Sequence, residues 1–378
     1  MKYSIKSDKG STEQKCVLTF VGDIMFARKV AVIGEEKGYD YFLNVIKPHL
    51  TGDLIVGNLE TVVSERGSPN KESLSNFRSS KESLYALSIF DILTLANNHI
   101  LDYGPESALD TAIAVKDVGI IALGIGETLN ESVKPYIAKI NGLNIAFYSL
   151  TMCRNVTKSQ KECFIASLKP IKQWKENIQK VKNTVDFVVA LIHFGYELSP
   201  YACPESRQEA KAMIDCGANL VIGTGSHVLQ GMETYKKGLI FYSLGDFIFD
   251  GVQEQRRETG IVQIHVIKQG VSIVDFTPAY IDDTYRPIPL ENDPGAKITE
   301  KVIFLSKILS NGKNDAFFYD QAKEAFFRSN IRSMGIALKK GGLKAIISTI
   351  RSFRLIHAKL IIISLKSLVT RHFNDKRK

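Results

Sequence analysis

Short apolar runs alternate with amphipathic segments along most of the chain, from residue 16 to residue 276. Uninterrupted apolar runs of about four to eight residues are typical of strands buried on both faces, whereas a period of about 3.6 residues indicates a helix. The runs predict strands at 16–21, 53–56, 91–95, 185–192 and 219–222. The periodic segments predict helices at 105–118, 170–181 and 205–216. This alternation indicates an α/β fold.

Three further predicted strands, at 239–244, 261–267 and 271–276, have no predicted helices between them. Strands that are joined directly pair antiparallel, because a parallel connection needs a longer crossover. We therefore expect mixed sheets, and a purely parallel doubly wound sheet fits less well.

The pattern changes after residue 277. The segment 278–296 holds four of the eleven prolines and is interpreted as a linker. Residues 297–330 show an amphipathic helical pattern, and 343–369 predicts a last helix with basic residues recurring on about one face. We therefore predict a main domain over 16–290 and a helical, basic extension over 297–378.

The net charge of +9 is concentrated at the C-terminal end of the chain. Residues 331–378 contain twelve Lys and Arg and one acid, Asp375, so this segment carries +11 and the remainder carries −2. The basic residues lack interleaved aromatic side chains, so we expect no nucleic-acid partner. Two interpretations of the tail stay open: a peripheral contact with an anionic membrane surface, or a helix packed on the main domain with a solvated basic face.

The cysteines and the N-terminal residues indicate a cytoplasmic protein. Five cysteines, an odd number without CxxC spacing, predict neither a disulfide framework nor a zinc–thiolate site. Residues 1–15 are polar and do not resemble a signal peptide, and the sequence has no uncharged apolar run of about eighteen residues. We expect a cytoplasmic location, with any membrane contact at the inner face through the tail.

Polar residues that can hold a metal follow five of the predicted strands. In an open α/β sheet the carboxyl ends of neighbouring strands face one crevice, so residues far apart in sequence can meet there. Asp, Glu, Asn and His together form an oxygen and nitrogen ligand set that suits Mn, Fe or Zn. The candidates are Asp23, Asn58, Glu60, Asn98, His99, Asp102, His193 and His227.

Taken singly, each of these residues has an ordinary structural explanation. Asp23 follows Gly22 and could form a turn. Asn58 and Asp102 could cap helices, and His193 could be a hydrogen-bonded interior imidazole. Structural roles are assigned outright to the histidines that do not follow a strand with polar neighbours, which are His49, His265, His357 and His372.

The order of the motifs is far more specific than any single residue. The chain carries, in order, Gly22-Asp23-Ile24-Met25, Gly57-Asn58-Leu59-Glu60, the segment 96–104, the segment 193–197, the segment 223–230 and the segment 242–247. This order resembles the bacterial capsule synthesis proteins of the CapA type, the poly-γ-glutamate capsule family, over residues 17–289. The family looks like a branch of the calcineurin-like metallophosphatases, which implies two facing mixed β-sheets flanked by helices, in four α/β/β/α layers.

The resemblance also implies roles for individual residues. His99, with Asp102 just beyond it, matches a histidine that does not bind the metal and could protonate a leaving group. Arg28 matches a family arginine that could bind a substrate anion. The metal ligands that the resemblance implies are Asp23, Glu60 with Asn58 beside it, Asn98, His193 and His227.

Two positions depart from the family pattern. Gly225 stands where a second histidine is common, so that one metal position could be weak or missing. Asp246 replaces the Asn that is usual in the Ser-Leu-Gly-Asn-Phe motif, and this extra carboxylate could bind the metal or only cap a loop. The first motif also lacks the Asp-x-His histidine of true phosphatases, which is normal for the capsule family.

The resemblance implies a role in building or exporting a surface polymer, either poly-γ-glutamate or a polysaccharide capsule. We expect a phosphoesterase-type hydrolase site with two divalent ions about 3.5–4 Å apart. The expected partners are an anionic polymer or phosphoester substrate and other capsule-synthesis proteins. Two alternatives stay open: a non-catalytic scaffold of capsule assembly, which Gly225 favours, and a general cytoplasmic phosphoesterase.

Overall fold

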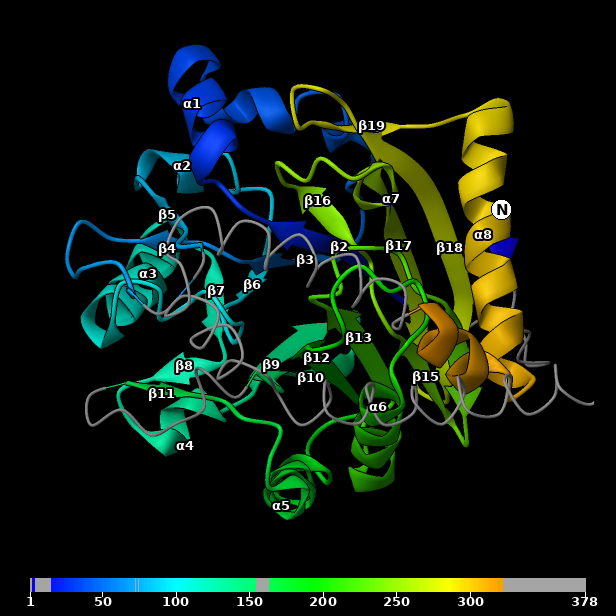
Figure 1. Cartoon of the computed structure of the whole chain (residues 1–378). Helices are drawn as coiled ribbons and strands as arrows, with labels where there is room; N and C mark the ends of the chain where they lie inside the picture. The colour runs from blue at the N-terminus through cyan, green and yellow to red at the C-terminus, as the bar shows by residue number, and fades with distance from the viewer. Residues whose placement is uncertain (1, 4–14, 72, 74, 154–162, 322–378) are drawn as a thin grey trace, which may run out of the picture. The chain divides into compact units, whose positions relative to one another are not determined.

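The computed structural model describes residues 2–3, 15–71, 73, 75–153 and 163–321. The chain divides into two compact units, residues 1–311 and 312–378. In the second unit the described residues are 312–321, of which 314–321 are helical. The predictions for the basic helix at 343–369 and for the whole segment 331–378 lie outside the described residues. The fold of the first unit is shown in Figure 1.

The first unit contains a large mixed sheet. Its strands are ordered β1-β18-β17-β2-β3-β6-β7, with β16 beside β2 and β19 beside β18. Strands β2, β3, β6 and β7 are parallel, as is the β16–β2 pair, whereas β17 runs antiparallel to both β2 and β18. The strands span Lys2–Tyr3 (β1), Cys16–Ile24 (β2), Leu54–Leu59 (β3), Ile92–Thr94 (β6), Ile121–Leu123 (β7), Asp246–Ile248 (β16), Glu258–Ile267 (β17), Gly270–Ile281 (β18) and Pro287–Pro289 (β19).

A second mixed sheet has the order β14-β15-β13-β12-β10-β9. Its four inner strands are parallel and its two edge strands are antiparallel. The strands span Tyr136–Ile140 (β9), Leu143–Thr151 (β10), Phe187–His193 (β12), Leu220–Thr224 (β13), Met232–Tyr235 (β14) and Gly238–Phe241 (β15). Two short strand pairs complete the β-structure: β4 (Val62–Val63) with β5 (Arg78–Ser79), and β8 (Ile125–Gly126) with β11 (Phe164–Ile165).

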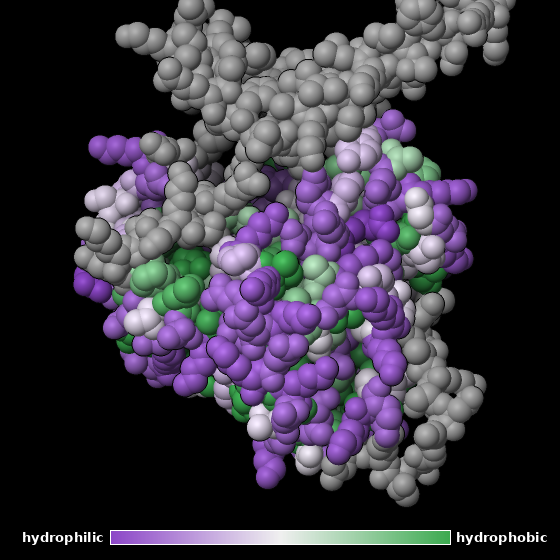
Figure 2. All heavy atoms as spheres, turned by 90° about the horizontal axis from the view of Figure 1, so that it is seen from below, coloured by the Kyte–Doolittle hydropathy of each residue, from purple (hydrophilic) through white to green (hydrophobic). Residues whose placement is uncertain are grey.

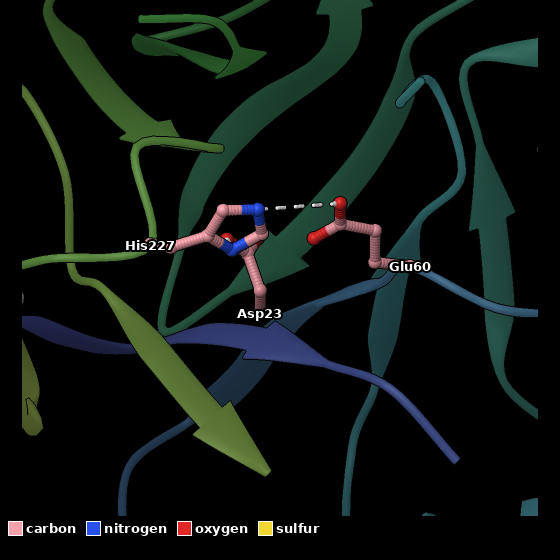
Figure 3. Close-up of side chains that lie close together, drawn as sticks. All are labelled: Asp23, Glu60 and His227. Atoms are coloured by element: carbon pink, nitrogen blue, oxygen red, sulfur yellow. Dashed lines mark ion pairs between the residues drawn. The ribbon is translucent and has the colours of Figure 1, made fainter. Parts of the chain in front are cut away.

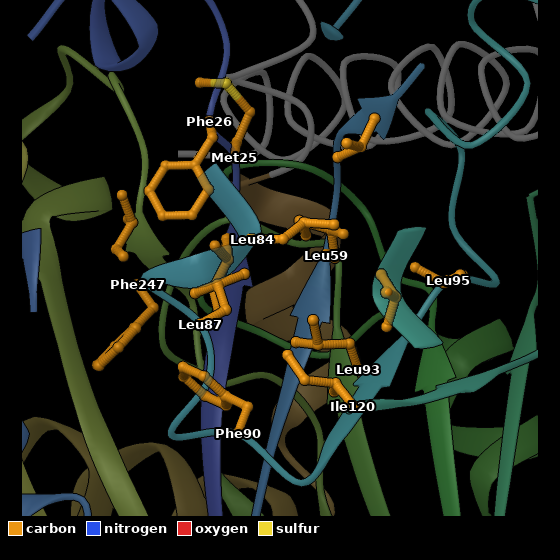
Figure 4. Packing of buried hydrophobic residues seen from close by; sticks show 14 of the residues in the cluster. Met25, Phe26, Leu59, Leu84, Leu87, Phe90, Leu93, Leu95, Ile120 and Phe247 are labelled. Atoms are coloured by element: carbon orange, nitrogen blue, oxygen red, sulfur yellow. The ribbon is translucent and has the colours of Figure 1, made fainter. Parts of the chain in front are cut away.

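Three layers of buried side chains show how the elements are stacked. One hydrophobic cluster lies between the two sheets, because it takes Leu18 and Phe20 from β2 together with Val189 and Leu191 from β12. A second cluster packs the other face of the first sheet, and Figure 4 shows part of it around Phe26 and Phe247. A third cluster packs the outer face of the second sheet around Trp174. Both sheets are thus buried on both faces, which is why their strands read as continuous apolar runs.

Helices cover the two outer faces. The second cluster includes side chains of α1 and α3, and the third includes side chains of α5 and α6. The four-layer α/β/β/α arrangement of two mixed sheets and flanking helices is therefore confirmed. The helices span Arg28–Lys37 (α1), Glu82–Tyr85 (α2), Pro105–Asp117 (α3), Leu129–Ser132 (α4), Ile171–Val181 (α5), Pro204–Cys216 (α6), Glu254–Arg257 (α7) and Asn292–Ser310 (α8), with 3-10 turns at Tyr39–Phe42 (η1) and Lys47–His49 (η2).

The prediction of a linker over 278–296, which was based on its prolines, is wrong. Residue 278 lies within β18, and Pro287 and Pro289 bound β19, which pairs with β18 at the edge of the first sheet. Proline is tolerated at a sheet edge and in the first turn of a helix, and Pro294 is the third residue of α8. Because Ile298 and Val302 of α8 belong to the cluster between the sheets, α8 is part of the first unit and not of the extension.

One prediction of antiparallel pairing also needs correction. Strands β17 and β18 form the expected antiparallel hairpin. Strand β15 instead lies in the second sheet, where it is parallel to β13 and antiparallel to β14. Among the described residues no helix is long and apolar enough to cross a membrane. Hydrophilic side chains dominate the face of the molecule in Figure 2, with hydrophobic residues between them in small groups.

Candidate metal centre

The predicted site residues converge where parallel strands of both sheets end. Asp23 lies near the end of β2, Glu60 follows β3, and His193 is the last residue of β12. His227 comes three residues after β13 ends. Figure 3 shows Asp23, Glu60 and His227 pointing toward one another from three different elements. The side chains that the strand pattern predicted to meet are therefore close together, and they come from the strand ends of both sheets.

A close approach of two backbones shapes one side of this site. A Cβ atom on Gly22 would lie 2.0 Å from the carbonyl oxygen of Gly245, so only glycine allows this contact. The contact places the start of β16 against the end of β2, with Asp246 as the backbone partner of Asp23. The Gly-Asp sequence therefore does more than form a turn, because it brings a second carboxylate beside the first.

Asp23, Glu60 and His227 form a cluster in which the ligand atoms lie within 4.8 Å of one another. All three side chains are buried, and Glu60 is completely inaccessible to solvent. Neither carboxylate oxygen of Glu60 accepts a hydrogen bond from any residue that the structure describes. A buried carboxylate without a hydrogen bond is strongly unfavourable in its charged form unless it is protonated or paired with a cation.

Three imidazole rings surround the same oxygen of Glu60. The Nε2 atoms of His99, His193 and His227 lie 3.7, 3.9 and 4.0 Å from Glu60 Oε1. Ligands bonded to one ion at about 2.0–2.2 Å are separated from one another by roughly 3–4 Å. The spacing of these atoms therefore fits a divalent ion between them, and the residues present fit the metal that the sequence predicted.

Burial and neighbouring charges shift the pKa values of the groups in this cluster. Burial raises the pKa of Asp23 to about 6, although His227, Asn58 and the Gly225 amide favour its charged form. Burial and the neighbouring carboxylates raise the pKa of Glu60 well above its ordinary value. Burial and the nearby His227 and His99 lower the pKa of His193 well below its ordinary value, which favours the neutral form of this imidazole.

Asp246 was predicted as a ligand, but its oxygens are directed to other partners. Oδ1 accepts a hydrogen bond from His227 Nδ1 at 2.7 Å, and Oδ2 accepts one from Arg256 Nε at 2.7 Å. A carboxylate that binds one nitrogen of an imidazole fixes the tautomer and leaves the other nitrogen free for a metal. In this geometry Asp246 orients His227, whose backbone adopts a left-handed conformation with φ of 61°.

Asn58 was also predicted as a ligand, but its amide group forms hydrogen bonds with protein groups around the site. Its amide nitrogen donates to Asp23 Oδ1 at 2.8 Å. Its amide oxygen accepts hydrogen bonds from Thr94 Oγ1 at 2.8 Å and from Asn97 Nδ2 at 3.3 Å. Both ends of the amide are therefore occupied by protein groups, and Asn58 holds the carboxylate of Asp23 in place. Asn98, the other predicted amide ligand, is half-buried in the turn after β6, and its ligand role stays a prediction.

His99 is oriented in the same manner as His227. Its Nδ1 lies 2.7 Å from Asp102 Oδ2, which also accepts the backbone N–H of Phe77 at 2.8 Å. The imidazole stacks on the Phe77 ring with 3.9 Å between the centroids. Its Nε2 therefore faces Glu60, while the side chain keeps 13% of its surface exposed. His99 is thus the imidazole of the three that a substrate can reach most easily.

Two arginines lie beside the centre, and only one of them was predicted. Arg28 pairs with Asp250 and lies over the Phe77 ring, with its guanidinium carbon 4.6 Å from the centroid. Arg256, which pairs with Asp246, lies 4.7 Å over the Phe249 ring. Although burial lowers it, the Asp246 carboxylate holds the pKa of Arg256 above its ordinary value. No motif in the sequence marks Arg256, because it comes from a short polar helix that only the fold brings to the site.

Residues 17–251 match the model of the family described as bacterial capsule synthesis protein PGA_cap. The chain belongs to this family. It is 31% identical over 286 residues to the capsule biosynthesis protein CapA of Bacillus anthracis, covering 73% of this chain and 70% of that protein. It is 30% identical over 324 residues to the PGA biosynthesis protein CapA of Bacillus subtilis, covering 82% and 81%.

Solved structures give a weaker similarity. A hypothetical protein from Thermus thermophilus matches with a TM-score of 0.45 and 14% identity, covering 70% of this chain and 99% of that one. A 5'-nucleotidase from Candida albicans matches with a TM-score of 0.40 and 12% identity, covering 78% of this chain and 58% of that one. The family assignment therefore rests on the sequence relatives, and the resemblance to CapA-type capsule synthesis proteins is confirmed.

Proposed function

We propose that this capsule synthesis family member is a metal-dependent hydrolase of the phosphoesterase type that acts in making an anionic surface polymer. The observation that carries the proposal is the buried carboxylate of Glu60, which has no hydrogen bond from a described residue and faces three imidazoles. A divalent ion bound there would supply a Lewis acid for a phosphoryl or acyl oxygen. Mn, Fe and Zn all suit the donor set.

His99 is the residue that we assign to proton transfer. Asp102 holds Nδ1, so the proton that His99 can deliver is at Nε2, on the side that faces Glu60. Stacking on Phe77 fixes the plane of the ring. A histidine held in this way can protonate a leaving group at the mouth of the centre. Asp102 acts by positioning His99 and does not itself meet the substrate.

Arg28 is assigned to binding an anionic group of the substrate. Its side chain is 39% exposed, and it contacts the same Phe77 ring as His99. A planar guanidinium binds carboxylate and phosphate groups with two parallel hydrogen bonds. An anionic polymer or a phosphoester would therefore place its charge on Arg28 and its scissile bond beside His99.

The test of this proposal has two steps. The full chain is purified without chelator, its metal content is measured, and it is then assayed against a panel of phosphoesters and against poly-γ-glutamate. Asp23→Ala/His193→Ala should lose the metal, and equal metal content in this variant would refute the centre. Bound metal with no turnover on any substrate would favour the second candidate, a scaffold of capsule assembly, which the glycine at position 225 supports. Broad activity on small phosphoesters would favour a general phosphoesterase.

We also propose, from the sequence alone, that the basic tail contacts an anionic membrane surface. Residues 331–374 contain no acid, and each basic residue near an anionic leaflet contributes about 1 kcal/mol. Sedimentation with anionic vesicles at low salt should pull down the full chain and not a truncation after Ser329. Equal binding by the truncated chain, or no binding by the full one, would remove this proposal.

A further inference from the structure

We infer that the centre holds a single divalent ion per chain, bound by Asp23, Glu60 and His227, and that Gly225 is the residue that keeps a second ion from binding beside it. The inference rests on the proposed function only in taking the centre to be a metal site. It departs from the two ions that the resemblance implies, and it follows from geometry and charge at this chain's own residues.

Few ligand atoms can meet at one point in this site. Among the described His, Cys, Asp and Glu side chains, the one group whose ligand atoms all lie within 4.8 Å is Asp23, Glu60 and His227. Metal centres that perform chemistry typically use three protein ligands and keep a further position open. Asn58 and Asp246, which could have completed a second ligand set, use their polar atoms on protein partners.

His193 has one ring nitrogen that contacts protein groups and one that faces Glu60. Its Nδ1 lies 3.3 Å from Asn58 Nδ2 and 3.1 Å from Thr224 Oγ1, so this nitrogen already has partners. Its Nε2 lies 3.9 Å from Glu60 Oε1, on the side where Gly225 passes. Nε2 is therefore the nitrogen of His193 that could bind an ion. A second ion at that position would need a further imidazole as a ligand.

Residue 225 cannot supply that imidazole. The backbone of Gly225 has φ of 99°, and a Cβ atom there would lie 2.8 Å from His193 Nε2. Any side chain would therefore displace His193. The backbone N–H of Gly225 instead donates to Asp23 Oδ2 at 3.1 Å. At this position the backbone holds the carboxylate of Asp23 in place, and no side chain is available to bind a second ion.

The charge of the buried groups also limits the number of ions. Asp246 is paired with Arg256, and Asp102 is paired with His99. The carboxylates left facing the centre are Asp23 and Glu60, and their two negative charges balance one divalent ion. A second divalent ion would leave two uncompensated positive charges in a buried site, which is strongly unfavourable.

The experiment counts ions by a readout independent of activity. The full chain is stripped with chelator, titrated with Mn²⁺ by calorimetry, and examined by electron paramagnetic resonance at saturation. We expect one ion per chain and the hyperfine pattern of an isolated Mn²⁺ ion. Two ions per chain, or the spectrum of a spin-coupled pair, would overturn the inference while leaving the metal site standing. No bound ion would overturn both the inference and the proposed function.

Variants of two histidines test which imidazole is the ligand. His227→Gln should weaken Mn²⁺ binding by more than about 100-fold, since even residues that only support metal ligands cost about 10–100-fold when changed. His193→Gln should leave the stoichiometry at one and change the affinity by less than about 10-fold. Circular dichroism and thermal unfolding in chelator establish that both variants fold. A larger loss of affinity in His193→Gln than in His227→Gln would refute the ligand set proposed for the single ion.

Discussion

Replacing Glu60 by Gln is expected to stabilise the protein without metal and to destabilise it with metal. The carboxylate is buried and accepts no hydrogen bond from a described residue, and burial raises its pKa well above the ordinary value of 4.5. A carboxyl group that ionises freely in the unfolded chain but not in the folded one lowers the free energy of unfolding. At pH 7 this effect amounts to at most about 3 kcal/mol, because each pH unit above 4.5 contributes about 1.4 kcal/mol.

Glutamine has nearly the same shape and no charge, so the variant should recover most of this energy in chelator. A gain of about 2 kcal/mol corresponds to a rise in Tm of roughly 3 °C for a unit of this size. With metal at about 1,000 times its Kd, binding raises the free energy of unfolding of the wild type by about 4 kcal/mol. A variant that cannot bind the metal does not receive this stabilisation. The order of stability should therefore reverse when chelator is replaced by Mn²⁺ or Zn²⁺.

The direction of the pH dependence follows from the same shift. A carboxyl group whose folded pKa is raised destabilises the folded state above its folded pKa, and the effect disappears below its unfolded pKa. In chelator the difference between Glu60→Gln and the wild type should therefore shrink as the pH falls from 7 toward about 4.5. Asp23, with its pKa raised to about 6, should add stability to both proteins over part of the same range.

The assay is urea unfolding followed by circular dichroism, at several pH values, in chelator and in metal. Glu233→Gln is the matched control, because Glu233 is also a buried glutamate but contacts the Tyr242 hydroxyl and Lys211 Nζ. The control should lower stability equally in chelator and in metal. If Glu60→Gln is less stable than the wild type in chelator at pH 7, the carboxylate is held by contacts that the structure does not show and the reasoning is refuted.

Three further predictions concern the roles around the centre. His99→Ala should retain the metal and reduce kcat by about 10²–10⁴-fold on any substrate that the wild type turns over; release of metal in this variant would mean that His99 is a ligand. Asp246→Ala should weaken metal binding by about 10–100-fold in a calorimetric titration, since His227 loses the carboxylate that orients it; unchanged affinity would mean that Asp246 only pairs with Arg256. Arg28→Ala should raise KM for an anionic substrate and leave metal content unchanged; an equal fall in kcat at unchanged KM would place Arg28 in the chemical step instead.

The hydrophobic pattern and the motif order determined the architecture and the family of this protein. The apolar runs marked most of the strands that build the two sheets, because strands buried on both faces must be apolar throughout. The same pattern marked α3, α5 and α6 within a residue or two of their observed ends. The position of Asp23, Glu60, His193 and His227 after strands was enough to predict that they meet, because parallel strands end at one edge.

The tertiary structure alone decided which polar groups face the centre of the site and which bind neighbouring protein groups. Asp246 and Asn58 have side-chain oxygens of the kind that bind metals. Only the structure shows that these oxygens accept hydrogen bonds from protein groups, among them His227 and Thr94. Arg256 carries no sequence signal, since a single arginine on a short helix is ordinary until the chain folds over Asp246. The proline-rich segment 278–296 was misread because proline breaks a central strand but is tolerated at a sheet edge. The local sequence pattern determines the secondary structure of a residue and the chemistry of its side chain. The direction of that side chain and its partners depend on contacts between segments far apart in sequence.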